Sequence, residues 1–100
     1  MGVVSGGSAV DKFAVDASRV VGGLRLRLRV PTDEMRLPKR PTKSLKKLFS
    51  EQKIPIEERD RAVVLCDDRG IVWVEKLGAA ERAAATVFTD KILKIEITEE

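Results

Sequence analysis

The sequence predicts an α+β domain dominated by antiparallel strands, with a few short helices. Three observations support this class: apolar and charged side chains alternate over residues 24–30, two apolar runs flank Asp67-Asp68-Arg69-Gly70, and an amphipathic helical stripe begins near Ser44. A period of two is typical of a half-buried strand, and a short glycine-containing loop between two strands indicates a hairpin. A chain of 100 residues has room for one hydrophobic core.

The N-terminal part of the chain is predicted to add little to that core. Residues 1–11 are rich in Gly, Ser and Val, so we expect a flexible leader there and a domain over residues 12–100. Alternation around Phe13 predicts a short strand over residues 12–16. The next strand, residues 24–30, has an apolar face of Leu24, Leu26, Leu28 and Val30 and a basic face of Arg25, Arg27 and Arg29.

A loop and then a helix are predicted in the middle of the chain. Three prolines lie in or beside residues 32–42, and proline disfavours both helices and central strands because it lacks an N–H donor. The i, i+3, i+4 spacing of Leu45, Leu48 and Phe49 then predicts a helix over residues 44–52 with these side chains in the core.

The C-terminal half is predicted to contain a hairpin and a final strand. Apolar runs at residues 62–66 and 71–74 form the hairpin, and Trp73 is expected in the core. The alanine-rich segment 79–85 favours a short helix by propensity. Alternation over residues 91–97 predicts the last strand.

The composition excludes several kinds of chemistry. Cys66 is the single cysteine and the chain has no histidine, which excludes an internal disulfide, a zinc cluster and an imidazole base. No apolar run approaches the roughly 18 residues of a membrane-spanning helix, and residues 1–10 do not resemble a signal peptide. We therefore expect a soluble, cytoplasmic protein without a membrane partner.

Three local patterns are similar to chemical sites, but each has a simpler interpretation. Ser5-Gly6-Gly7-Ser8 is similar to a phosphate-binding loop, yet only Val3 and Val4 precede it, which favours a linker. The acids of residues 57–60 alternate with arginines, which predicts a local salt-bridged turn. Cys66 lies in an apolar run and is expected to be an inert core thiol. No catalytic residue or metal ligand is predicted, and we expect no ATP hydrolysis by this chain alone.

Basic residues are concentrated in one part of the sequence. Eleven basic and three acidic residues lie between Arg19 and Lys53, whereas the whole chain has a net charge of +3. This asymmetry indicates either a surface that faces a polyanion or a solvated basic face.

The start of the predicted helix and the loop before it supply the main candidate binding residues. Lysines in a first helical turn are disfavoured by the helix dipole, by about 0.3–1 kcal/mol each, so a phosphate backbone would relieve them. We expect RNA-backbone contacts at Arg36, Arg40, Lys43, Lys46 and Lys47. Further candidates are Arg25, Arg27, Arg29, Lys39, Arg59 and Arg61, although acids on a neighbouring strand are an alternative partner for the first three. The absence of tyrosine and the scarcity of other aromatics argue against base stacking and favour reading of a duplex backbone.

Several segments, in order and spacing, resemble a known family. They are residues 31–34, 36–38, 42–49, 53–55, 58–61 and 70–74. Together they resemble the C-terminal domain of the tRNA(Ile)-lysidine synthetase family, over residues 13–97. The family usually has Pro-Gly-Asp-Arg where this chain has Pro31-Thr32-Asp33-Glu34, and glycine where Lys39 and Pro41 stand.

The resemblance implies an accessory domain of a larger ligase. An N-terminal ATP pyrophosphatase domain, outside this chain, would use ATP and magnesium to join lysine to the wobble cytidine of a tRNA. This domain would need no cofactor of its own, and its partners would be tRNA, including the acceptor stem, and that catalytic domain. Its fold would be a layered β-sandwich with short helices, also found in the phenylalanyl-tRNA synthetase β subunit. The alternative function is a protein-interaction or regulatory module with a basic face.

Overall fold

The structure is a computed structural model that describes residues 2–5 and 11–97. Its elements are β1 (Gly2–Ser5), β2 (Val15–Asp16), the 3-10 helix η1 (Ala17–Arg19), β3 (Arg25–Leu28), β4 (Glu34–Arg36), β5 (Thr42–Ser44), α1 (Leu45–Glu51), α2 (Ile56–Asp60), β6 (Val63–Asp67), β7 (Gly70–Val74), β8 (Gly78–Ala79) and β9 (Ile92–Glu96). Within the described residues, no helix has the length and apolar composition needed to cross a membrane.

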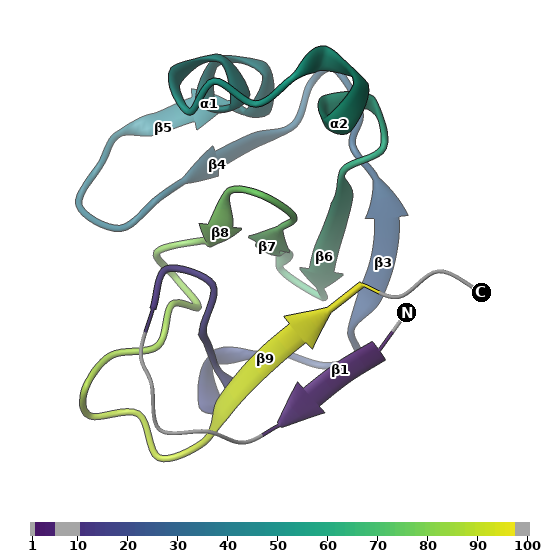
Figure 1. The fold of residues 1–100 in the computed structure, drawn as a ribbon. Helices are drawn as coiled ribbons and strands as arrows, with labels where there is room; N and C mark the ends of the chain where they lie inside the picture. The colour runs from purple at the N-terminus through teal and green to yellow at the C-terminus, as the bar shows by residue number, and fades with distance from the viewer. Residues whose placement is uncertain (1, 6–10, 98–100) are drawn as a thin grey trace.

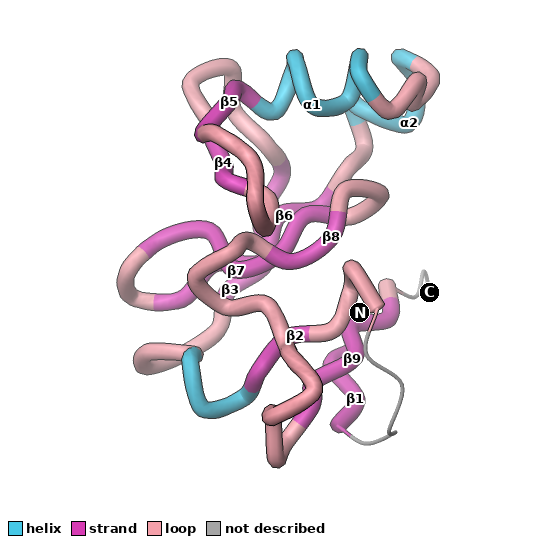
Figure 2. Tube along the Cα trace, turned by 90° about the vertical axis from the view of Figure 1, so that its left-hand side faces the viewer, coloured by secondary structure: helices cyan, strands magenta, loops and turns pink. Residues whose placement is uncertain are grey.

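The strands form two antiparallel sheets and a separate two-stranded ribbon. The larger sheet has the strand order β3-β6-β7-β8, the smaller sheet has the order β1-β9-β2, and β4 and β5 make the ribbon. In Figure 1 the ribbon and both α-helices lie at the top, the larger sheet in the middle, and β1 and β9 below. Figure 2 shows the same three layers after a turn of 90°. The predicted layered α+β class is confirmed.

The predicted hairpin is confirmed as β6–β7, which lies at the centre of the larger sheet. Asp67 pairs with Gly70, so Asp68 and Arg69 form a two-residue loop between the strands. Gly70 has a φ of 136°, a backbone conformation that favours glycine because it has no Cβ.

Hydrophobic side chains separate the three layers. Leu45, Leu48 and Phe49 of α1 are fully buried against the larger sheet. Trp73 of β7 is buried between the two sheets, where partly buried side chains of β9 pack against it. The predicted core positions are therefore confirmed, and Cys66 is buried as expected of a core thiol.

Strand β3 departs from the predicted alternation at its C-terminal end. Leu24 and Leu26 are half-buried, but Leu28 is 59% exposed. Arg29 turns inward instead, and its guanidinium lies 5.6 Å from the ring centre of Phe49. The strand ends at Leu28, so the period of two does not continue beyond it.

The loop predicted over residues 32–42 is wrong, because part of this segment pairs as a ribbon. Glu34 lies opposite Ser44 and Arg36 opposite Thr42. The prolines of this segment lie outside the paired positions, so no ladder hydrogen bond is lost to them. The connecting loop contains Lys39, whose φ of 64° is left-handed.

The helix predicted over residues 79–85 is also wrong. Ala79 pairs with Trp73 in β8, and the N–H of Ala80 donates to the carbonyl of Val72 at 2.9 Å. Ala84 forms an isolated bridge with Val15 of β2. Neighbouring strands thus supply partners for this backbone, which overrides the helical propensity of alanine.

Three smaller differences concern the ends of two strands and the ion pairs of α2. The strand predicted over residues 12–16 is reduced to Val15–Asp16, and the last strand is Ile92–Glu96. The acids of residues 57–60 lie in α2 and pair at longer range rather than in a local turn, for example Asp60 with Arg29 at 3.3 Å.

The N-terminal segment contains a strand where the sequence predicts a leader. Gly2–Ser5 pairs with β9, with Gly2 opposite Glu96. Residues 6–8 of the Ser-Gly-Gly segment lie outside the described residues.

Candidate nucleic-acid interface

Six cations lie on the ribbon and on α1, at one end of the molecule, and five of them are exposed. We call this area the ribbon–helix surface, and its members are Arg36, Lys39, Arg40, Lys43, Lys46 and Lys47. Four of them, Lys39, Arg40, Lys46 and Lys47, are exposed and form no ion pair with any carboxylate in the part of the chain that the structure describes. These four charges are free to meet an anion.

The other two members already have acidic partners. The Nε of Arg36 lies 2.6 Å from a carboxylate oxygen of Glu81 and donates to the carbonyl of Arg40 at 3.0 Å. The Nζ of Lys43 lies 2.8 and 2.7 Å from the two carboxylate oxygens of Glu51, and this hydrogen bonding lowers the pKa of Glu51. Any anion that binds at these two positions must compete with a carboxylate.

The start of α1 is only partly as the sequence predicts. Lys46 and Lys47 lie in the first turn and are exposed. However, the Oγ of Ser44 caps the helix by accepting a hydrogen bond from the N–H of Lys47 at 3.1 Å, and the helix has only 7 residues. The ammonium charges, rather than free helix amides, therefore dominate the positive potential here.

Each arginine of the β3 segment has a carboxylate partner. The pairs are Arg25 with Asp68 at 3.5 Å, Arg27 with Asp33 at 2.8 Å, and Arg29 with Asp60 at 3.3 Å. Arg27 makes two hydrogen bonds to Asp33, which lower the pKa of that carboxyl. The partners come from turns and from α2 rather than from an adjacent strand. This arrangement makes the β3 arginines poorer phosphate ligands than the free lysines.

Arg59 and Arg61 mainly hold α2 in place. The Nε of Arg59 donates to the carbonyl of Ile54 at 2.6 Å, and its Nη1 donates to the Oγ of Ser50 at 3.1 Å. Arg61 is exposed, and its Nε donates to the carbonyl of Glu57 at 3.4 Å. Only Arg61 therefore presents its charge to solvent.

Sequence reasoning missed a buried charge at the end of the β6–β7 hairpin. The side chain of Asp67 has no exposed area, pairs with the guanidinium of Arg82, and accepts the backbone N–H groups of Val21, Arg69 and Gly70 at 2.9, 2.8 and 3.1 Å. Burial alone would raise the pKa of Asp67, but these donors outweigh it and hold the pKa well below its usual range. Asp67 looks like an ordinary turn residue in the sequence, so no local signal could have revealed the pair with Arg82.

Comparison with known proteins identifies relatives of this chain. A family model described as "TilS substrate C-terminal domain" matches residues 24–95. The tRNA(Ile)-lysidine synthase of Caldanaerobacter subterraneus subsp. tengcongensis is 35% identical over 86 residues, which cover 85% of this chain and 18% of that protein. The protein of the same name from Clostridioides difficile is 34% identical over 80 residues, which cover 80% of this chain and 17% of that protein. The chain therefore spans less than a fifth of the length of these relatives.

Two solved structures share the fold. A crystal structure of a TilS C-terminal domain has a TM-score of 0.67 and 32% identity, and the match covers 91% of this chain and 78% of that chain. An N-terminal fragment of the phenylalanyl-tRNA synthetase β subunit from Pyrococcus horikoshii has a TM-score of 0.65 over 91% of this chain and 27% of that chain, but its 13% identity shows a common fold alone. The sequence resemblance is thereby confirmed: the chain belongs to the TilS substrate C-terminal domain family.

Proposed function

We propose that this domain grips tRNA for a larger tRNA(Ile)-lysidine synthase. The observation that carries the proposal is the ribbon–helix surface, with its four unpaired cations, in a chain of this family. The relatives are much longer than this chain, so catalysis, ATP and magnesium belong in the proposal to the rest of that enzyme. A cytoplasmic location, where tRNA is modified, is part of the same proposal.

The chemistry of this surface suits a phosphate backbone. Lysine and arginine neutralise phosphates and release the counterions that surround a nucleic acid, which gives affinity without reading the bases. In the part of the chain that the structure describes, no group of three His, Cys, Asp or Glu side chains lies close enough to hold a metal ion. The proposed contact is between ammonium or guanidinium groups and phosphates.

The experiment replaces Lys46 and Lys47 with alanine and measures tRNA binding over a range of salt concentrations. We expect weaker binding at low salt, and a plot of log affinity against log salt that is flatter by about 0.7–0.9 for each lost contact. The free domain should be as stable as before or slightly more stable, because cations near a helix start are unfavourable.

A matched control removes the same charge elsewhere. Lys76, which lies 3.8 Å from Glu58, follows β7, and the half-buried Lys94 lies in β9. Both are outside the ribbon–helix surface, so their double replacement by alanine controls for the loss of two positive charges and should leave the salt slope unchanged. Equal effects of the two double variants would mean that net charge alone matters. An unchanged slope in the Lys46 and Lys47 variant would move the RNA contact to another surface or favour a protein-interaction module.

A further inference from the structure

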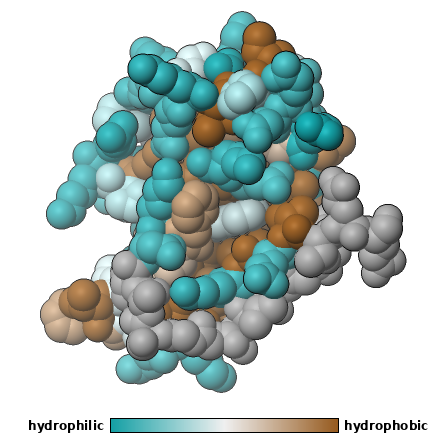
Figure 3. All heavy atoms as spheres, viewed as in Figure 1, coloured by the Kyte–Doolittle hydropathy of each residue, from teal (hydrophilic) through white to brown (hydrophobic). Residues whose placement is uncertain are grey.

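An apolar knob projects from the loop between β8 and β9. Its two residues, Val87 and Phe88, are 83% and 89% exposed, more than any other large apolar side chain in the described residues. Figure 3 shows apolar atoms projecting at the lower left of the view, where this loop lies in Figure 1. Exposure of a whole phenyl ring is unfavourable in water and needs a reason.

The knob is held in one conformation by its flanking threonines. The N–H of Phe88 donates to the Oγ1 of Thr86 at 3.2 Å, and the N–H of Thr86 donates to the Oγ1 of Thr89 at 2.9 Å. The Oγ1 of Thr89 in turn donates to Asp16 at 2.9 Å, and Asp16 is buried beside η1. The phenyl ring is thus presented on an ordered turn, so little conformational entropy is lost when a ligand binds.

A hollow connects this loop with the ribbon–helix surface. Its volume is about 460 Å³, and its lining includes Arg40 of the ribbon loop, Gln52 at the end of α1 and Ala85, three residues before Phe88. Lys12 also lines the hollow, and its Nζ donates to the Oε1 of Gln52 at 3.2 Å. The charged lining consists of the cations Lys12 and Arg40 and the acids Asp11 and Glu51, of which Glu51 is already paired with Lys43.

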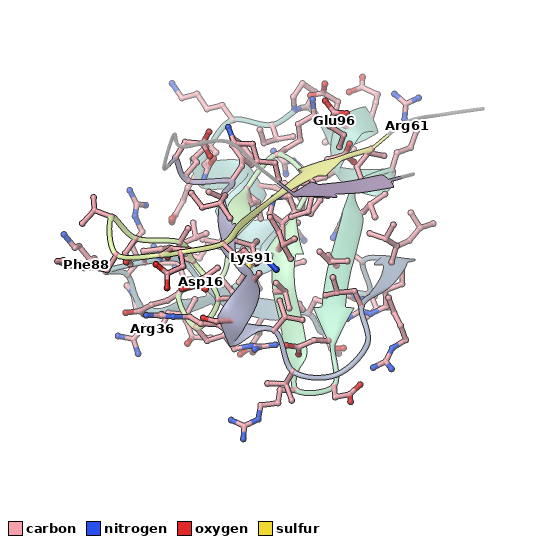
Figure 4. The ribbon with its side chains drawn as sticks, turned by 90° about the horizontal axis from the view of Figure 1, so that it is seen from below. Asp16, Arg36, Arg61, Phe88, Lys91 and Glu96 are labelled. Atoms are coloured by element: carbon pink, nitrogen blue, oxygen red, sulfur yellow. The ribbon has the colours of Figure 1, made fainter. Side chains whose placement is uncertain are left out.

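The knob and the ribbon lie on the same side of the molecule. In Figure 4, seen from below, the labelled Arg36 and Phe88 both project to the left, and the β4–β5 loop and the β8–β9 segment project to the left in Figure 1 as well. Asp16, labelled near Phe88, has its oxygens occupied by Ser18, Thr89 and Arg19, so its charge is compensated.

We propose that Phe88 stacks on an unpaired nucleotide base at the end of an RNA whose duplex backbone lies on the ribbon–helix surface. This inference rests on the proposed tRNA-binding function and adds a second, base-contacting site to it. The face of a phenyl ring takes any base without reading its hydrogen-bonding edge, and the free cations of the ribbon–helix surface attract the phosphates of the duplex. The scarcity of aromatics in the sequence therefore does not exclude stacking, because the single ring that matters is fully exposed.

The test compares two RNA probes that have the same short duplex, one with blunt ends and one with a single-stranded end. The unmodified chain should bind the probe with the single-stranded end about 5- to 100-fold more tightly, since stacking of one base on an aromatic side chain has an effect of this size. Phe88→Ala should abolish this preference. Its salt slope should stay unchanged, because no phosphate contact is removed, and its thermal midpoint should also stay unchanged, because the ring is exposed.

Three further variants separate stacking from a simple apolar contact. Phe88→Trp should restore the preference, whereas Phe88→Leu should not, because leucine is apolar but has no π-face. Val87→Ala removes the neighbouring apolar side chain and should have little effect.

A preference that persists in Phe88→Ala, or that Phe88→Leu restores, would overturn the stacking site and point to a protein partner for the knob. Failure of the unmodified chain to bind either probe would instead refute the tRNA-binding function itself, and the stacking site with it.

Discussion

Replacement of Asp67 by alanine is expected to destabilise the domain strongly. The substitution leaves the partly buried N–H groups of Val21, Arg69 and Gly70 without this acceptor and leaves Arg82 without its carboxylate. Breaking a fully buried ion pair costs about 3–5 kcal/mol, but the side chain of Arg82 is 34% exposed and can be rehydrated, which lowers the cost. An unsatisfied buried N–H adds about 1–3 kcal/mol. We expect a total loss of about 2–4 kcal/mol in the free energy of unfolding.

Urea unfolding measures this loss, and the neighbouring Asp68 supplies a matched control. Asp68 carries the same charge one residue later, but its side chain is 56% exposed and its pair with Arg25 spans 3.5 Å. Asp68→Ala should therefore cost less than about 1 kcal/mol. The difference of about 1–4 kcal/mol, divided by an m-value of about 1–3 kcal/mol per molar urea, should lower the midpoint of Asp67→Ala by about 0.3–4 M relative to Asp68→Ala.

The pH dependence of stability provides a second readout of the same carboxylate. The folded-state pKa of Asp67 lies below its unfolded value of about 3.9, so its stabilisation is complete above that value and is lost as the pH falls below it. The unmodified chain should thus lose stability on acidification, and Asp67→Ala should lose less. If Asp67→Ala unfolds within about 0.5 kcal/mol of Asp68→Ala and shows the same acid sensitivity as the unmodified chain, the buried pair does not stabilise the fold as argued.

Two further substitutions test the packing. Phe49→Ala should cost about 3–5 kcal/mol in urea unfolding, because the ring is fully buried under α1 and leaves a cavity; a change near zero would contradict its place in the core. Gly78→Ala should lower the thermal midpoint far more than Gly23→Ala, because a Cβ at Gly78 would lie 2.4 Å from the carbonyl oxygen of Lys12 at a φ of +113°, whereas nothing lies within 4 Å of a Cβ at Gly23. Similar midpoints for the two glycine variants would refute that close approach.

Elements whose signals are local could be predicted from the sequence. The apolar stripe of α1 and the two apolar runs of the β6–β7 hairpin depend on neighbours within a few residues, so their periodicity was sufficient. The ribbon was hidden because its prolines lie beside rather than within the paired positions. The helix predicted for the alanine-rich segment is wrong because the N–H of Ala80 donates to Val72, in a different strand. Helix propensity carries no information about such a partner.

In the candidate site, too, local features could be predicted from the sequence and long-range contacts could not. Exposure of Lys46 and Lys47 follows from helical periodicity and could be predicted, whereas the pairing of Arg36 with Glu81 joins residues far apart in the sequence. The same long separation concealed Asp67 and Arg82. Charge counting identified the basic segment correctly but could not separate cations that are free from cations that the fold has already neutralised.

The left-handed backbone of Lys39 is a conformation that suits glycine better than lysine. Glycine adopts a φ of 64° without strain, whereas a residue with a Cβ pays about 1–2 kcal/mol for it. The ribbon loop of this chain thus gives up some conformational stability, and in return it gains a positive charge at its exposed tip. Selection on affinity for an anion and selection on stability would act in opposite directions at this position. Lys39→Gly would therefore remove one exposed cation and relieve the backbone strain at the same time, without a change in the fold.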